Sequence, residues 1–202
     1  MKFLKHLAGY MSVNLANGIA AFGGVYVFTR LLSADEYGRY ALMFSVMTLV
    51  HTLSLSAAEA SSYRFAARAA AKGNLADHYR TTISFSVRSF GVSLALLAGL
   101  AVVFSGEPAY LRILPWIAIM MPANTVVKIA LESHRAGQRV SRYVVVEVLR
   151  VLGGFTLGSL LALLTNAGAS APFMGLAGAG LVLALSEGRW LLRQAKGGTS
   201  DP

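Results

Sequence analysis

The sequence contains no cysteine, few charged residues and very few acids. Of its 202 residues 13% are charged and nine are Asp or Glu, whereas 55% are hydrophobic. The absence of cysteine excludes disulfides, thiolate metal sites and cysteine nucleophiles. A composition so apolar and so poor in charge is untypical of a water-soluble domain, and it indicates a protein of the lipid bilayer.

The motifs of enzymes are missing as well. No nucleotide-binding glycine loop and no Ser/His/Asp set stands out, and the four histidines, His6, His51, His78 and His134, lack the spacing of metal ligands. We therefore expect no enzyme activity, no metal and no other cofactor. The net charge of +9 comes from 18 Lys and Arg, and in a membrane protein such an excess reports orientation rather than a nucleic-acid partner.

Long apolar runs dominate the chain. A hydrocarbon core of about 30 Å needs roughly 20 helical residues, and six stretches meet that length. They are residues 7–29, 40–60, 83–105, 111–130, 143–165 and 171–189. Short polar connections containing Gly and Pro separate them. The sequence predicts an all-α, polytopic membrane protein, with residues 1–202 forming a single lobe of six transmembrane helices.

The basic residues predict the orientation of these helices. Thirteen lie on one side: Lys2, Lys5, Arg64, Arg68, Lys72, Arg80, Lys128, Arg135, Arg139, Arg142, Arg189, Arg193 and Lys196. Only Arg30, Arg39 and Arg112 lie on the other, and Arg88 and Arg150 fall within spans. By the positive-inside rule both termini are cytoplasmic, which requires an even number of spans.

The connection between the first two spans, "RLLSADEYGRYAL" (30–42), has a physical explanation. Ser33 followed by Glu36 three residues later is the pattern of a capping box, and Asp35 and Glu36 suit the positive end of a helix dipole. We therefore expect a very tight turn and a helix that starts at Ser33. Capping does not explain Arg30.

The same segment carries a family resemblance. An arginine closing the first span, then Leu-Leu, an acidic pair, Tyr-Gly and a second apolar helix ("VFTRLLSADEYGRYALMFSV") resembles the amino-terminal signature of the O-antigen and polysaccharide flippases. These belong to the multidrug, oligosaccharidyl-lipid and polysaccharide exporter superfamily. The segments "EASSYRFAARA" (59–69) and "LESHRAGQRVSRYVVVEVLRVLGG" (131–154) continue the likeness. Family members have two six-helix lobes, so this chain resembles one lobe, as a fragment or as a half-transporter that needs a second copy or partner.

The resemblance implies the transport of an oligosaccharide on polyprenyl pyrophosphate across the cytoplasmic (inner) membrane by alternating access. Cations in a wet lumen would bind the pyrophosphate, because a charge that faces lipid is costly. Arg88 lies about five residues into its span, so it either snorkels to the surface or faces the lumen. Glu147 and Arg150 share a helix face at spacing i, i+3. They form an internal salt bridge, or they act directly in binding or ion coupling, and in both cases they face inward.

Four further residues have two interpretations each. His51 is a packing histidine or a proton-coupling group. Asn14 and Asn17 share one face, and they bond a neighbouring helix or contact substrate. Arg30 reaches outer headgroups or guards the outer mouth. The glycines of 153–158 and 175–180 have a spacing that lets helices pack closely, with a contact between lobes as the alternative.

Two other functions share this architecture. One is an ion-coupled exporter of drugs or small molecules, which would favour an apolar cavity with an acidic ion site. The other is a membrane scaffold or assembly subunit without transport activity, which the lack of a second lobe makes credible. The expected partners are membrane lipids, the lipid-linked oligosaccharide, and a second lobe or copy.

Overall fold

The structure is a computed structural model that describes the backbone of residues 2–197 and the side chains of residues 9–197. Its elements are α1 (Lys2–Leu31), α2 (Ala34–Ser54), α3 (Ser56–Ala71), α4 (Leu75–Val103), α5 (Pro108–Leu111), α6 (Leu114–Ala136), α7 (Val140–Leu164), the 3-10 turn η1 (Gly168–Ser170) and α8 (Ala171–Ala195). No strand occurs in the described range, so the predicted all-α class is confirmed.

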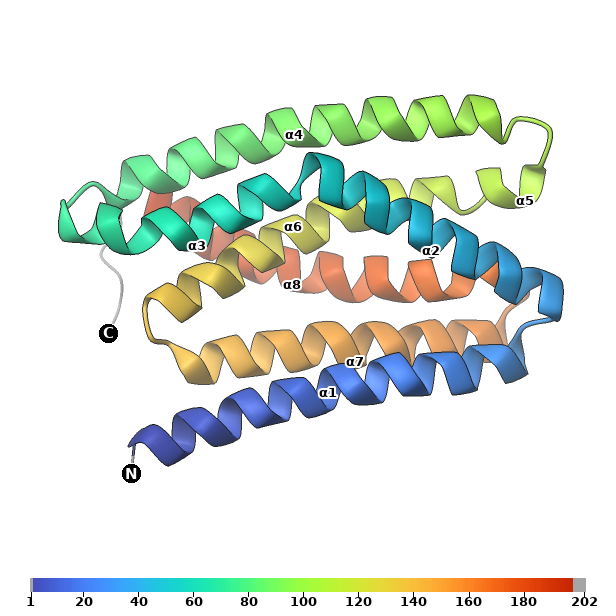
Figure 1. Cartoon of the computed structure of the whole chain (residues 1–202), viewed down its shortest axis with the longest axis horizontal. Helices are drawn as coiled ribbons and strands as arrows, with labels where there is room; N and C mark the ends of the chain where they lie inside the picture. Colours follow the sequence, from blue (N-terminus) through green and yellow to red (C-terminus); the bar gives the residue numbers. More distant parts are fainter. Residues whose placement is uncertain (1, 198–202) are drawn as a thin grey trace.

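The long helices form one elongated bundle (Figure 1). α1 begins and α8 ends at the same end of the bundle, where the α3–α4 and α6–α7 connections also lie. The α1–α2, α4–α6 and α7–α8 connections lie at the opposite end. The three segments richest in basic residues, 64–80, 135–142 and 189–196, therefore meet at one end, called here the basic end. The assignment of this end to the cytoplasm stays a prediction.

Among the residues that the structure describes, five helices are long and apolar enough to cross a membrane, and α2 with α3 makes a sixth if the bent pair counts as one span. The chain is thus a multi-pass membrane protein. At the basic end the helices outrun the predicted spans: α4 starts at Leu75 rather than 83, and α8 continues to Ala195 rather than 189. Apolar windows detect the hydrocarbon layer alone, whereas the helical hydrogen bonds continue through the polar headgroup region.

The predicted second span, 40–60, stays a prediction, and within it the helix breaks at Leu55, where α2 and α3 meet at a bend of 49°. Hydroxyl groups around the break bond backbone carbonyls: Ser54 Oγ donates to Val50 O and Ser56 Oγ to Thr52 O, both at 2.6 Å. Such bonds from serine to the preceding turn bend helices. The predicted capping box at the start of α2 is present, with Glu36 Oε2 3.0 Å from the Ser33 amide.

The core joins α2, α6 and α8 around the fully buried Met43, Ile117 and Phe173. Next to it, α7 and α8 meet along a seam of glycines. A Cβ added to Gly175 would lie 2.6 Å from Gly154 O and closer still to the backbone of Gly158. The expectation that these glycines serve helix packing is therefore confirmed.

Candidate functional site

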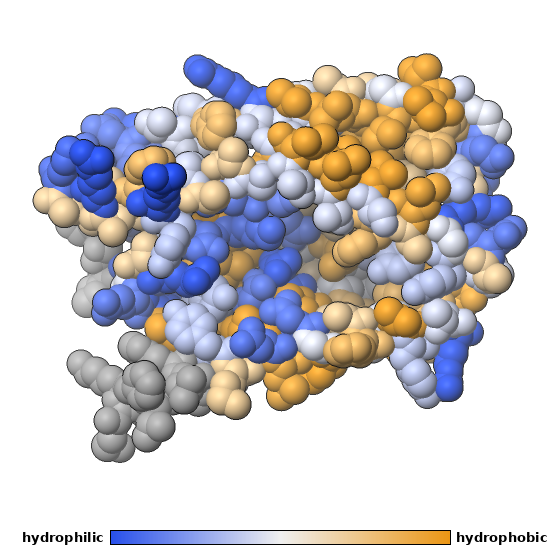
Figure 2. Space-filling view, viewed as in Figure 1, coloured by the Kyte–Doolittle hydropathy of each residue, from blue (hydrophilic) through white to orange (hydrophobic). Residues whose placement is uncertain are grey.

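A polar cavity of about 290 Å³ opens between α3, α6 and α7. Most of its polar lining comes from Glu59, Lys128, Glu132, Tyr143, Glu147 and Arg150. In the space-filling view this face is hollowed between α2–α3 and α7, and hydrophilic residues fill the hollow (Figure 2). Charged groups on three helices thus meet within the apolar bundle.

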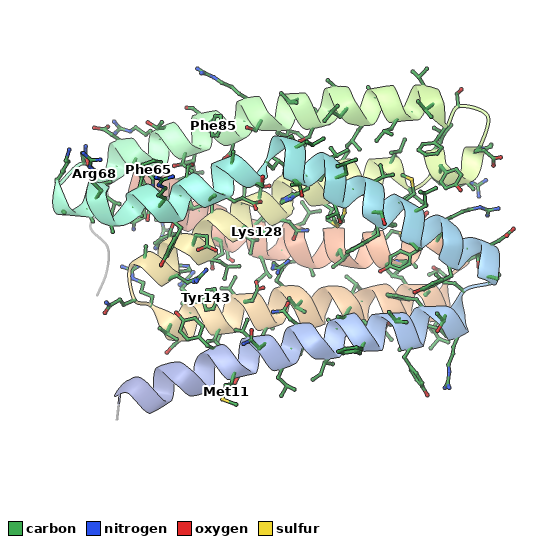
Figure 3. The ribbon with its side chains drawn as sticks, viewed as in Figure 1. Met11, Phe65, Arg68, Phe85, Lys128 and Tyr143 are labelled. Carbon is green, nitrogen blue, oxygen red and sulfur yellow. The ribbon has the colours of Figure 1, made fainter. Side chains whose placement is uncertain are left out.

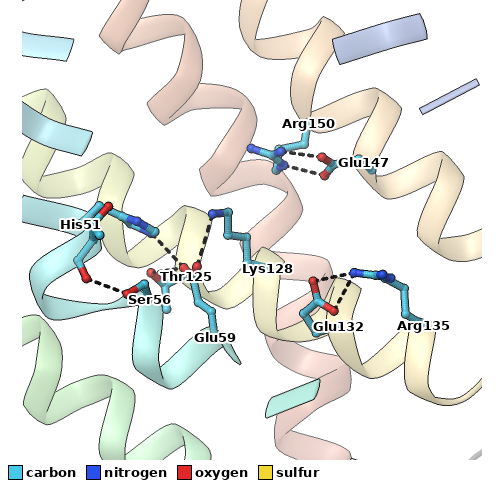
Figure 4. A network of polar contacts seen from close by, with 10 residues as sticks. His51, Ser56, Glu59, Thr125, Lys128, Glu132, Arg135, Glu147 and Arg150 are labelled. Carbon is cyan, nitrogen blue, oxygen red and sulfur yellow. Dashed lines mark hydrogen bonds and ion pairs between the residues drawn. The ribbon is translucent and has the colours of Figure 1, made fainter. Parts of the chain in front are cut away.

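Glu59 is the most highly connected group at this site (Figure 4). Its carboxylate accepts hydrogen bonds from Thr125 Oγ1 at 3.2 Å and Lys128 Nζ at 3.3 Å, and it lies 2.9 Å from His51 Nε2. Glu59 is only 8% exposed. A carboxylate so deeply buried is tolerated because charged and polar donors surround it.

The sequence places Glu59 here through the break at Leu55. Glu59 lies one helical turn beyond the break, and Ala58, Ser62 and Ala66 share its buried side of α3. These small residues let α3 approach α6 closely, which brings the carboxylate within reach of Lys128. The bend therefore positions the acid.

Glu147 and Arg150 form the second part of the site. Arg150 donates from Nε and Nη2 to the two carboxylate oxygens of Glu147, at 2.8 and 2.6 Å. The side chain of Arg150 is 19% exposed and that of Glu147 is 11% exposed. The predicted pairing on one inward face of this helix is present, and it makes both charges tolerable inside a bundle.

The charges of the site balance. The three carboxylates, Glu59, Glu132 and Glu147, face two lining cations, and Arg135 supplies a third by donating to Glu132 at 3.0 and 3.1 Å. Two of the five N–H groups of Arg150 go to Glu147. Lys128 bonds one acceptor among the described residues. Lys128 and Arg150 therefore each retain N–H donors that can bind a ligand, although the charges of the cavity and Arg135 together sum to zero.

The structure separates the predicted site residues into two groups. Glu147, Arg150 and, through Glu59, His51 converge on the cavity. The other four, Arg30, Arg88, Asn14 and Asn17, are exposed and lie away from its lining.

These four residues have their own surroundings. The Arg30 guanidinium covers the Tyr26 ring at 3.9 Å and bonds its hydroxyl. Arg88 is exposed on α4, and its two predicted roles, snorkelling or facing the lumen, both stay open. Asn17 bonds Val13 O within its own helix, and no bond to another helix is present for Asn14 or Asn17 in residues 9–197. The two alternatives for these asparagines, a bond to a neighbouring helix or a contact with substrate, therefore stay predictions.

Sequence reasoning missed Glu59, Thr125, Lys128 and Glu132. Glu59 and Lys128 fall at the ends of the predicted spans 40–60 and 111–130, where charges are ordinary. In the structure Lys128 lies eight residues before the end of α6 and faces α3, so it is not a loop residue. One signal was available: the histidine at 51 and the acid at 59 both interrupt one apolar stretch.

A second buried cluster ties α6, α7 and α8 together. His134 Nε2 lies 2.8 Å from Glu187 Oε2, and Arg142 Nη2 donates to Glu187 Oε1 at 2.9 Å. His134 is fully buried, and its ring packs on Trp190 at 4.4 Å. Glu187, an acid within the predicted span 171–189, was also missed. This cluster fixes the α6–α7 connection on α8.

A family model described as polysaccharide biosynthesis protein matches residues 3–195, nearly the whole chain. Neither a curated protein nor a solved structure matches the sequence.

Proposed function

The chain belongs to the polysaccharide biosynthesis protein family, and we propose that it moves a lipid-linked oligosaccharide across the cytoplasmic membrane. The cargo is an oligosaccharide on polyprenyl pyrophosphate. It passes from the cytoplasmic to the outer leaflet by alternating access, for the export of surface polysaccharide. The family and the membrane-spanning helices support a role of this type.

The neutral polar cavity is the observation that carries the proposal. A glycan can cross hydrocarbon only where hydrogen-bonding groups replace its water, because each unsatisfied polar group costs several kcal/mol in lipid. The cavity offers donors and acceptors on three helices, and its charges balance once Arg135, which is paired with Glu132, is counted. Such a site suits a ligand rich in hydroxyl groups. The unused donors of Lys128 and Arg150 suit the pyrophosphate.

The cavity lies on one open face of the bundle (Figure 2). An enclosed pathway requires a second wall, and we propose that a second lobe or a second copy of the chain supplies it. Alternating access then exposes the cavity to each side in turn.

An ion-coupled exporter of small molecules is the alternative, and the pair of His51 and Glu59 favours it. A buried carboxylate beside a histidine is the chemistry of a proton site. The apolar cavity expected for a drug exporter is not what the lining shows, because five charged side chains face it.

The test removes the charge of the site without leaving a buried partner unpaired. The double variant Glu147→Gln, Arg150→Gln removes both charges of the pair together and leaves polar amides at both positions. In cells that contain only this variant of the protein, we expect the lipid-linked oligosaccharide on the cytoplasmic face of the membrane to increase at least tenfold. The loss of one charge-assisted hydrogen bond, about 1.5–3 kcal/mol, corresponds to a factor of that size.

Two further variants make this test decisive. Lys128→Gln should cause the same accumulation, whereas Arg189→Gln, an exposed arginine on α8 outside the cavity, should not. Size-exclusion chromatography of each purified variant checks that it is folded. Normal export by folded forms of both cavity variants would reject the cavity as the path of the cargo.

A further inference from the structure

A second hollow, of about 490 Å³, lies between α3 and α4 near the basic end. Its lining combines cations, polar groups and two aromatic rings: Arg68, Lys72, Asn74, His78, Phe65 and Phe85. Figure 3 shows Phe65 and Arg68 on α3 and Phe85 on the adjoining α4. We call this hollow the α3–α4 groove.

The groove is separate from the polar cavity. Phe65, Arg68 and Lys72 recur at the three- and four-residue spacing of one helix face, whereas Glu59 lies on the opposite side of α3. The cavity is charge-balanced and lies between α3, α6 and α7. The groove is bounded by α3 and α4 alone, and its chemistry differs.

The cations of the groove are available to a ligand. Arg68 and Lys72 are exposed, and neither has an ion-pair partner within residues 9–197. The acid in the lining, Asp77, is bonded to Arg80 at 3.2 Å. Asn74 precedes the first turn of α4 without capping it, so the amides of that turn add positive potential. The groove therefore favours an anion.

The lengths of the helices place this anion site at membrane-headgroup depth. The 29 residues of α4 extend for roughly 43 Å, about 13 Å more than the hydrocarbon thickness. The far end of α4 is apolar, with Val102 and Val103 each 74% exposed, so the surplus length belongs to the basic end. About 13 Å from Leu75, the hydrocarbon boundary falls next to Phe85.

Apolar surface continues from the groove along α4. Phe65 and Phe85 are 46% and 44% exposed, and Val92 and Leu96, on the same side of α4 as Phe85, are 53% and 38% exposed. A free anion gains nothing from contact with these apolar walls, whereas the acyl chain of a lipid buries their apolar surface. The glycan of the transported cargo, by contrast, requires polar walls around it.

We propose that the α3–α4 groove binds an anionic glycerophospholipid. Arg68 and Lys72 bind its phosphate, Phe65 and Phe85 flank the glycerol and the upper acyl chain, and the rest of the chain follows α4. The leaflet is the one at the basic end. The site goes beyond the proposed transport activity, because its ligand is a resident lipid and its residues lie outside the polar cavity.

Lipid binding to the purified full chain in detergent, counted by native mass spectrometry, tests the proposal. The probes are phosphatidylglycerol, phosphatidylcholine with the same acyl chains, and inorganic phosphate. We expect phosphatidylglycerol to bind in preference to phosphatidylcholine. The double variant Arg68→Gln, Lys72→Gln should weaken phosphatidylglycerol binding by about thirtyfold, since each cation near anionic headgroups contributes about a factor of five.

Two variants complete the design. Phe85→Ala should weaken binding of the lipid but not of inorganic phosphate, because it removes only the apolar wall. Arg193→Gln, another exposed basic-end arginine that lies outside the groove, should leave lipid binding unchanged. Three results would overturn the proposal. The double variant could bind phosphatidylglycerol as tightly as the wild type does, the wild type could bind both lipids equally, or it could bind inorganic phosphate as tightly as phosphatidylglycerol.

Discussion

Replacement of Gly175 by alanine tests the seam between α7 and α8. The new Cβ would lie 2.6 Å from Gly154 O and closer to the backbone of Gly158. Ordinary contacts need about 3.5 Å, so the two helices must part by about 1 Å. Because the obstructing atoms belong to the backbone, no side chain can rotate away. Overpacking of this kind costs about 1–3 kcal/mol.

Thermal unfolding in detergent measures the cost. For a chain of this size each kcal/mol lowers Tm by about 2–4 °C, so Gly175→Ala should lower it by about 2–12 °C. The control is Gly99→Ala, because a Cβ added to this exposed helical glycine meets nothing within 4 Å. Alanine favours the helix by about 0.5–1 kcal/mol, so the control should melt slightly higher. An unchanged Tm for Gly175→Ala would refute the close approach of the two helices.

Two other substitutions test local contacts by the same melting experiment. Ser33→Ala removes the capping bond to the Glu36 amide and should lower stability by about 0.5–2 kcal/mol. The control Ser45→Ala, at an exposed position inside α2, should lower stability less. Equal effects of the two substitutions would contradict the capping role of Ser33. Glu187→Gln leaves Arg142 without its carboxylate and should cost about 1–3 kcal/mol. The surface variant Asp77→Asn, which removes an exposed ion pair, should cost less than about 1 kcal/mol. If Asp77→Asn and Glu187→Gln lowered stability equally, the stabilising role of the buried cluster would be contradicted.

Local patterns predicted the fold well, because each depends on residues near in sequence. Apolar length identified the helices, the spacing of Ser33 and Glu36 identified the cap, and the spacing of Glu147 and Arg150 identified their ion pair. The break at Leu55 was not predicted, because a serine hydroxyl that bends a helix leaves no interruption in the hydropathy of the sequence.

The site itself depends on contacts between distant segments. Glu59 meets Thr125 and Lys128 across 66 and 69 residues, and no periodicity of a single helix encodes that meeting. The sequence presents Glu59 and Lys128 as charges at span ends. The bend turns one of them inward, and the length of α6 beyond its apolar run keeps the other inside the bundle. Arg88, by contrast, lies well inside its span but outside the site.

The bend at Leu55 also makes α3 a lever. Hydrogen bonds of the helical type continue through the break, from Leu55 N to His51 O and from Glu59 N to Leu55 O, so flexing there need not release them. The 16 residues of α3 give an arm of roughly 24 Å. A change of about 10° at this pivot would move its far end by roughly 4 Å, about three-quarters of one helical turn. Small angular changes at one serine-flanked joint would thus be magnified where α3 meets α4.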